Sequence, residues 1–307
     1  MNAPTPVPAP SGVVLQEAAP GQVAAALALL PGLLRDDVPA TVAPPRLWVC
    51  HDEARPLEPL AAAGFWPQVP GGGARGFRLH LHVQPERRRR GLGRALLEAA
   101  SREVRAWDVF QIVAPEVPAD GPADAFLAAS GFRATATLHH FLAHVRDAGP
   151  VCLGLAERLH QRRRVPDGFN VVDLRTVPLA AVVDLHHREF SATPEGAQAL
   201  LKRTLADPVT GPLSVGLWNG HTLAGYLLAG LTDGLPDLRF WASPPQFRQG
   251  WAAALLLAGY VERFAREGHR ECRFHCNDGT RATLNMARKT QAALLKVVRL
   301  YVRDLPP

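Results

Sequence analysis

The stretch VQPERRRRGLGRAL, residues 83–96, decides the fold and points to a binding site. It continues an alternating segment, GFRLHLHV (76–83), whose period of two predicts a strand. Behind it, Leu92, Leu96 and further apolar residues recur at helical spacing, which predicts a helix over residues 89–107. The stretch is therefore expected to be a loop that leads from a strand into a helix.

The composition of this loop favours the binding of an anion. Gly91 and Gly93 let the backbone approach a phosphate closely, and the first amides of a helix have no partner within it. The helix dipole adds to the attraction, and Arg87 to Arg90 and Arg94 bring positive charge to the same place. The alternative is a basic turn before an ordinary amphipathic helix, but the V-x-P prefix and the strand–loop–helix context favour anion binding.

Length and composition predict a soluble protein of two domains. At about 100–200 residues per domain, 307 residues suggest two, and 47% hydrophobic with 20% charged residues is typical of chains that bury sizeable cores. No apolar run is long enough for a membrane span. The first residues, MNAPTPVPAPSGVV, lack the features of a signal peptide, so we expect residues 1–11 to be a disordered lead-in and the protein to be cytoplasmic.

The formal net charge of +6 is compatible with nucleic acid, a membrane surface or an anionic cofactor. The excess is concentrated in Arg87–Arg90 and Arg162–Arg164, and local clusters suit a discrete polyanion better than a long groove. Interleaved aromatic residues and a recognised nucleic-acid module are missing from the sequence, so nucleic acid ranks last among the partners.

The cysteines do not form a disulfide or metal pattern. Four are scattered along the chain, and the pair Cys272 and Cys276, which flanks His275, lacks the second half of a metal motif. We therefore expect buried free thiols rather than a metal site.

The order of predicted elements occurs twice: strand, helices, antiparallel strands, strand–loop–helix, strand, helix, strand. In the first half we expect helices over 19–35, 89–107 and 122–132 and strands over 47–50, 76–83, 109–115 and 133–145. In the second half we expect strands over 169–175, 238–243, 271–276 and 294–302, a hairpin over 213–231 that turns at Asn219-Gly220, and helices over 178–189, 194–207, 249–267 and 280–290.

This repetition predicts an α/β (α+β) chain of two tandem domains, each with a mixed, mostly antiparallel sheet and helices on both faces. The expected boundaries are 12–148 for the first domain, 149–167 for a linker and 168–307 for the second domain. A short helix within the connection 146–168 is the alternative to an irregular linker.

The stretch 83–96 resembles the acetyl-CoA signature of the GNAT superfamily, the Gcn5-related N-acetyltransferases. The resemblance extends over most of residues 12–145, where Ala123–Phe132 is similar to the family's later helix motif. It implies that the backbone of Leu81 and Val83 pairs with pantetheine. It also implies that the pyrophosphate of coenzyme A is wrapped by a loop consisting of Arg88, Arg89, Arg90, Gly91, Leu92, Gly93 and Arg94.

The second half resembles the same superfamily more loosely. In SPPQFRQGWAAALL (243–256), an alignment without a gap puts Trp251 at the first glycine position, whereas a one-residue deletion puts Gly250 there and shortens the loop. NDGTRATLNMARKT (277–290) resembles the family's later helix, with its final Gly-Phe replaced by Gln291-Ala292. Two such domains resemble the tandem acetyltransferases that include mycothiol synthase, whose halves divide cofactor binding and catalysis unequally.

Transfer to an amine needs a base for the ammonium proton and stabilisation of the leaving thiolate. The family often has a Glu on the cofactor strand, an odd number of residues before the position of Arg88. In the first domain no residue of that parity is a base; these residues are Phe77, Leu79 and Leu81. His80 and His82 have the other parity and are expected to face away unless a bulge re-aims them. The family's usual Tyr acid falls at Leu127.

The second domain offers the candidates for chemistry. Asp237 lies eleven residues before Arg248, the family's spacing for its Glu, and is the candidate base; a turn residue within DGLPD is the alternative. Tyr301 on the final strand is the candidate acid.

The resemblance implies an acetyl-CoA-dependent N-acetyltransferase that acts on an amine of a small molecule or peptide, without a metal. The alternative is an acyl-CoA-binding pseudoenzyme or regulatory protein that lacks turnover. No membrane partner is expected, and a homodimer is compatible with the sequence.

Overall fold

The computed structural model describes residues 12–30, 46–68, 76–105, 111–190, 192–232, 234–248 and 250–305. The chain divides into two compact units: unit 1 consists of residues 1–135 and 299–307, and unit 2 of residues 136–298. The expected lead-in, residues 1–11, lies outside the described residues. None of the described helices is long and apolar enough to cross a membrane.

Unit 1 contains a mixed sheet in which antiparallel neighbours predominate. Its strand order is β1 (Val13–Glu17), β2 (Arg46–Asp52), β3 (Arg55–Gln68), β4 (Gly76–Val83), β5 (Gln111–Pro118) and the end of β12 (Ala293–Asp304). The strands β1 to β4 pair antiparallel, and β4 pairs with β5 parallel.

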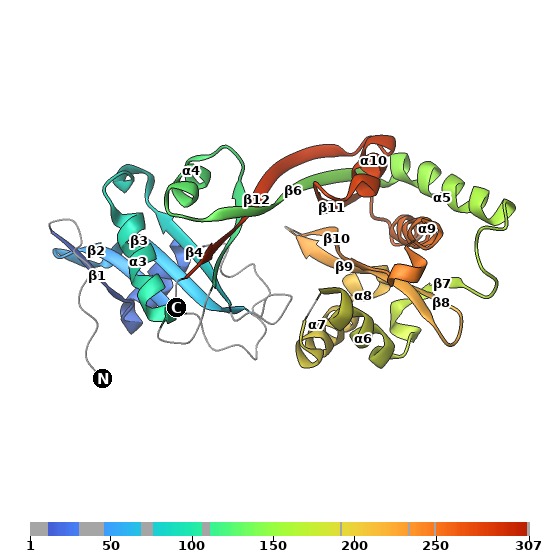
Figure 1. Cartoon of the computed structure of the whole chain (residues 1–307), viewed down its shortest axis with the longest axis horizontal. Helices are drawn as coiled ribbons and strands as arrows, with labels where there is room; N and C mark the ends of the chain where they lie inside the picture. The colour runs from blue at the N-terminus through green and yellow to red at the C-terminus, as the bar shows by residue number, and fades with distance from the viewer. Residues whose placement is uncertain are drawn as a thin grey trace. The chain divides into compact units, whose positions relative to one another are not determined.

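Helices cover both faces of this sheet (Figure 1). On one face α3 (Leu92–Arg105) and α4 (Pro122–Ala129) enclose a core with Phe65, Phe77 and Leu79. On the other face α1 (Val23–Leu29) covers a smaller core around Trp66. Because strand side chains alternate, β3 contributes to both cores.

Unit 2 repeats this plan. Its strand order is the start of β12, β6 (Arg133–His144), β11 (Glu271–Asn277), β10 (Leu235–Ala242), β9 (Leu223–Thr232), β8 (Val215–Trp218) and β7 (Asn170–Asp173). The pair β10–β11 is parallel, as β4–β5 is in unit 1.

Unit 2 is also covered on both faces, with α9 (Trp251–Arg266) on one side of β8 and β9 and α6 (Leu179–Phe190) and α7 (Pro194–Ala206) on the other (Figure 1). On the α9 side lie α5 (Val145–Gln161), which packs against α9, and α10 (Arg281–Lys289). The short α8 (Thr210–Leu213) precedes β8. The predicted fold class, two tandem mixed α/β domains, is confirmed.

Three features differ from the sequence expectations. The expected linker 149–167 is largely the helix α5. The expected boundary at 148 does not hold, because β6 passes into unit 2 after Thr135 and residues 299–307 return to unit 1. The long strand β3 was not expected at all, since its three prolines and central alanines lack a strand pattern.

Candidate functional site

The loop between β4 and α3 has the conformation that its sequence predicts. Hydrogen bonds from Arg87 N to Gln84 O (2.9 Å) and from Arg88 N to Pro85 O (3.3 Å) form the single 3₁₀ turn η2 (Pro85–Arg87). Arg89 and Gly91 then take left-handed φ angles of 62° and 81°. The helix begins at Leu92 instead of Arg89, because these two residues leave helical geometry.

The amides that follow η2 are available to a ligand. Ala95 N is the first to bond backward, to Gly91 O at 3.0 Å. Within the described part of the chain, no backbone oxygen accepts from the amides of Arg89 to Arg94. These donors gather at the positive end of α3, which is where an anion gains most from them.

Close packing fixes the start of α3 against its neighbours. A Cβ atom on Gly93 would lie 3.4 Å from the ring of Phe126 on α4 and 3.6 Å from Leu81 on β4. Leu92 is buried beside them. Residue 93 therefore lies where α3, α4 and the end of β4 meet, at distances that are ordinary van der Waals contacts for a Cβ atom.

An unpaired strand edge lies beside this loop. The strands β4 and β5 pair only from Gly76 to Arg78, and no described residue of β5 pairs with β4 beyond that point. Because Gln84 N donates to Leu60 O at 3.0 Å, the even-numbered residues at the end of β4 bond to β3. The backbone groups of Leu81 and Val83 consequently face the open side.

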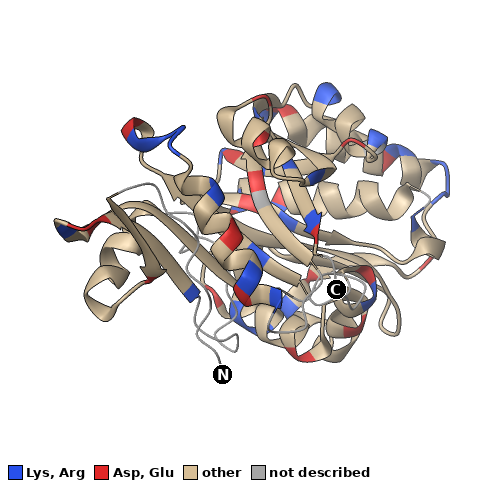
Figure 2. Ribbon diagram, turned by 60° about the vertical axis from the view of Figure 1, so that its left-hand side comes forward, with Lys and Arg blue, Asp and Glu red and all other residues tan. Residues whose placement is uncertain are grey.

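The arginines of this loop differ in whether their guanidinium groups are bonded to the protein or exposed. Arg88 Nε donates to Val83 O at 3.2 Å, so this guanidinium closes the junction between strand and loop and occupies one carbonyl of the open edge. Arg89, Arg90 and Arg94 are exposed, and no described residue forms an ion pair with them. This loop therefore carries positive charge that no described acidic residue offsets; all basic residues are blue in Figure 2.

The side chains of β4 alternate between its two faces as parity predicts, and the face of Phe77 and Leu79 is buried. Phe77 and Leu79 are 2% and 3% exposed and lie in the core beneath α3 and α4, so a substrate would have to displace that core to reach them. His80 stacks on Trp66 with ring centroids 5.1 Å apart, on the opposite face. His82 shares that face and is half-buried. The face of β4 on which parity places a base is therefore filled by the core of unit 1, where a substrate cannot reach it.

The corresponding loop of unit 2 follows the alignment with a deletion. Arg248 Nε donates to Ser243 O at 2.9 Å, as Arg88 does to Val83, and Ala254 N bonds to Gly250 O at 3.1 Å, as Ala95 does to Gly91. Gly250 has a φ of 90°. It therefore takes the place of Gly91, and the loop is one residue shorter.

The shorter loop is also less suited to an anion. Trp251 replaces Leu92 as the first helical residue and packs against Phe169 and Phe247. Glu189 on α6 forms an ion pair with Arg248, so the loop's own arginine is already neutralised.

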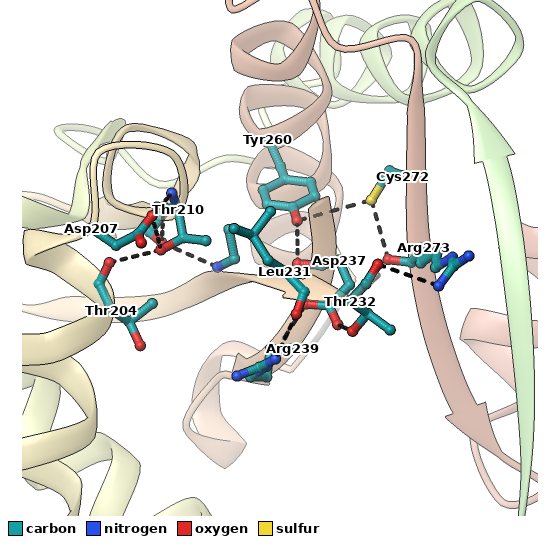
Figure 3. A network of polar contacts seen from close by, with 12 residues as sticks. Thr204, Asp207, Thr210, Leu231, Thr232, Asp237, Arg239, Tyr260, Cys272 and Arg273 are labelled. Carbon is teal, nitrogen blue, oxygen red and sulfur yellow. Dashed lines mark hydrogen bonds and ion pairs between the residues drawn. The ribbon is translucent and has the colours of Figure 1, made fainter. Parts of the chain in front are cut away.

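Asp237, the candidate base, lies at the start of β10 within a network of polar contacts (Figure 3). Its side chain accepts a hydrogen bond from the Thr232 hydroxyl and lies 3.8 Å from Arg239 Nε. Its backbone oxygen accepts from the Tyr260 hydroxyl at 3.0 Å. The Asp237 carboxylate is therefore already engaged by the Thr232 hydroxyl and the Arg239 guanidinium.

A register shift between Leu238 and Phe240 decides where Asp237 points. Leu238 packs beneath α9, whereas Phe240 packs on the α6 side. Asp237, which precedes Leu238, therefore faces the α6 side. The equal spacing before Arg248 and Arg88 leads to opposite faces in the two units, because no such shift occurs in β4.

Tyr301, the candidate acid, lies in unit 1 and is 4% exposed. Its hydroxyl hydrogen-bonds to Asp124 on α4, and Arg299 Nη1 donates to the other oxygen of that carboxyl at 2.7 Å. Burial raises the pKa of Tyr301, and the bond to Tyr301 lowers the pKa of Asp124. The structure therefore does not bring Tyr301 and Asp237 together within one unit.

The four cysteines are free, and three of them are buried. Cys272 is half-buried, and burial raises its pKa to about 12, so it is a weak nucleophile. No group of three or more metal-ligating side chains occurs among residues that the structure describes.

Comparison with known proteins identifies the family of unit 1. Residues 28–132 match the family model described as "Acetyltransferase (GNAT) family". Unit 1 belongs to the GNAT superfamily. No curated protein sequence matches the chain significantly.

Solved structures extend the fold to the whole chain. A GCN5-related N-acetyltransferase from Sphaerobacter thermophilus superposes with a TM-score of 0.70 at 14% identity, covering 98% of each chain. A tandem GNAT protein from the clavulanic acid biosynthesis pathway does so with a TM-score of 0.66 at 18% identity, covering 96% of this chain and 99% of its own. At these identities the likeness concerns the fold, so the GNAT fold occurs twice. The family match of unit 1 supports acyl transfer as the general chemistry of that unit.

Sequence reasoning missed several residues that shape the site. Phe126 against Gly93 and Asp124 beneath Tyr301 were not singled out, because contacts between α4 and distant elements leave no local pattern. His82 was expected to lie on the face opposite to Phe77 and Leu79, and the structure places it there. The direction of the His82 side chain depends on the continuous register of β4, and the sequence alone does not show whether a register shift occurs there.

Proposed function

We propose that unit 1 binds acetyl-CoA at the start of α3 and transfers the acetyl group to an amine of a small molecule or peptide. The observation that carries this proposal is the set of unpartnered amides from Arg89 to Arg94, placed beside the open edge of β4. Membership of unit 1 in the GNAT superfamily supports it.

The residues present fit the chemical parts of coenzyme A. The amides of the loop would hold the diphosphate, and the exposed Arg89, Arg90 and Arg94 would offset its charge. Leu81 N–H and C=O and Val83 N–H remain on the open edge and would pair with pantetheine as an added strand does. When bound, acetyl-CoA supplies an acyl group attached to a thiolate leaving group.

Calorimetric titration with coenzyme A tests the site. We expect Gly91→Ala to raise the Kd by about tenfold or more, because a side chain at a φ of 81° costs about 1–2 kcal/mol and distorts the amides around it. Gly131→Ala is the matched control, since Gly131 has a φ of 80° at the end of α4, with nothing near its Cβ position. Equal affinity in the two variants would refute the assigned site.

A pseudoenzyme that binds acyl-CoA without turnover is the second candidate. It is favoured by the engagement of both acid–base candidates, Asp237 by Arg239 and Tyr301 by Asp124. An assay of free thiol release from acetyl-CoA over a panel of primary amines separates the two functions. Amine-dependent release by the full chain would exclude the pseudoenzyme.

A further inference from the structure

We propose that His82 is the general base of unit 1 and accepts the proton of the acceptor ammonium. This inference rests on the proposed acetyl transfer. It replaces the earlier candidates with a residue on the strand that borders the cofactor loop.

The position of His82 in the strand is the first argument. It lies between Leu81 and Val83, whose backbone groups face the open edge of β4. Its side chain points to the face opposite α3 and α4, because its neighbours Leu81 and Val83 pack against the core on their side. An acceptor that approaches the thioester from the face away from that core would therefore meet His82.

The protonation state of His82 is the second argument. Burial, and to a smaller extent the positive charge of Arg88, lower the pKa of His82 below its usual value. Among the described residues that surround it, β3 presents the uncharged Ala62, and β4 itself presents His80 on the same face. No described residue hydrogen-bonds the ring of His82. A neutral imidazole with a free nitrogen is what a base near neutral pH requires.

Unit 2 has no histidine in β10 at the position equivalent to His82 in β4. His82 and Ala242 both precede their loop arginine by six residues, and no register shift follows Phe240 in β10. Ala242 is 1% exposed and pairs with the fully buried Tyr226. The equivalent space in unit 2 is therefore core, and the proposed chemistry resides in unit 1.

The proton and electron movements of the step balance. The ring nitrogen of His82 takes a proton from the acceptor ammonium and becomes imidazolium. The neutral amine nitrogen attacks the thioester carbonyl carbon, so that an N–C bond forms and the C–S bond breaks. The electron pair of that bond leaves on the thiolate, which receives the proton from imidazolium directly or through solvent. The amide then loses its second amine proton to solvent.

The pH profile of the full chain tests this assignment. With the amine that gives the fastest thiol release, wild-type kcat should fall as the pH drops through the pKa of His82, since the base must be neutral. His82→Gln should lower kcat by roughly 100-fold or more and remove this acidic limb, while the Kd for coenzyme A stays within about twofold. His80→Gln is the matched control on the same face, and it should keep the limb.

Each other outcome counts against a defined part of the proposal. If His82→Gln keeps both the limb and the rate of His80→Gln, or if Asp237→Asn alone removes the limb, His82 is not the base. If coenzyme A binds but no amine is acetylated by the wild type, the proposed function itself fails. NMR titration of the His82 ring gives a readout without an acceptor, and a midpoint at or above about 6.5 overturns the proposal.

Discussion

At the scale of single residues, the contacts of the Tyr301 hydroxyl indicate a role in stability rather than in acid catalysis. Its bond to Asp124 ties the last strand to α4, and Arg299 adds a second tie to the same carboxyl. A proton committed to a buried contact is not free for a leaving thiolate. We expect Tyr301→Phe to lower the urea midpoint of unit 1, because Asp124 loses a donor, and to change kcat by less than about threefold. A large loss of kcat with an unchanged midpoint would restore Tyr301 as the acid.

A buried histidine in unit 2 predicts an acid-sensitive fold. His186 is 2% exposed, pairs with the Tyr226 hydroxyl and lies against Phe190 and Phe240. Burial lowers the pKa of His186 to about 4, against about 6.5 in the unfolded chain. The unfolded state therefore binds the proton more readily, and stability is lost as the pH falls from 6.5 towards 4.

The size of this effect follows from the two pKa values. Between pH 7 and pH 5 the free energy of unfolding of unit 2 should fall by about 2 kcal/mol because of His186. Hydrogen exchange of the β9 amides at both pH values measures the change. His186→Gln keeps a polar partner for Tyr226 and should lose most of that dependence. Parallel curves for the variant and the wild type would show that another group is responsible.

At the scale of elements, the sequence predicted the helices, strands and turns that are determined by a few neighbouring residues. The strand 76–83, the loop after it and the hairpin at Asn219-Gly220 occur as expected, since periodicity and turn chemistry act over a few residues. The strand β3 was missed because its pairing with β2 and β4 overrides its prolines. Between the two halves the sequence allowed only a short helix, because Gly149 and Pro150 disfavour a long one, whereas α5 has 17 residues and packs along α9.

The site was predictable to a similar extent. The glycines and arginines of the loop indicate the proposed anion site. The opposite directions of equivalent side chains in β4 and β10 depend on one register shift near Arg239. Such a shift depends on how two strands fit a whole sheet, so a count of residues along one strand cannot reveal it.

The two loops, compared as elements, predict one cofactor site per chain. The loop of unit 1 has unpartnered amides and exposed arginines, whereas that of unit 2 is one residue shorter and its Arg248 is paired with Glu189. Calorimetry should give one molecule of coenzyme A per chain. Gly250→Ala, at a φ of 90°, should leave that binding unchanged, in contrast to Gly91→Ala. Two sites, or a loss of binding in Gly250→Ala, would contradict the assignment to unit 1.

At the scale of the whole molecule, each unit is completed by a strand from the other half of the sequence. Asp304 of β12 accepts from Gln111 Nε2 at 3.0 Å and from Arg133 Nε at 3.3 Å, and all three residues belong to unit 1. In unit 2, β6 pairs with β11 along its length from Leu138 to His144. Neither half of the sequence therefore contains all the strands of its own fold.

This exchange predicts that the end of the chain controls cofactor binding about 200 residues away in sequence. Removal of residues 299–307 deletes Tyr301 and Leu305, each 4% exposed, from the core that holds α3. Losing two such side chains costs about 5 kcal/mol or more, which is comparable to the stability of a whole domain. We expect the truncated chain to lose coenzyme A binding and the protection of its β5 amides, while the β9 amides of unit 2 stay protected. Removal of residues 306–307 alone is the control, and a synthetic peptide of residues 293–307 should restore binding in part. Unchanged affinity after the longer truncation would mean that the start of α3 is held by the first half of the sequence alone.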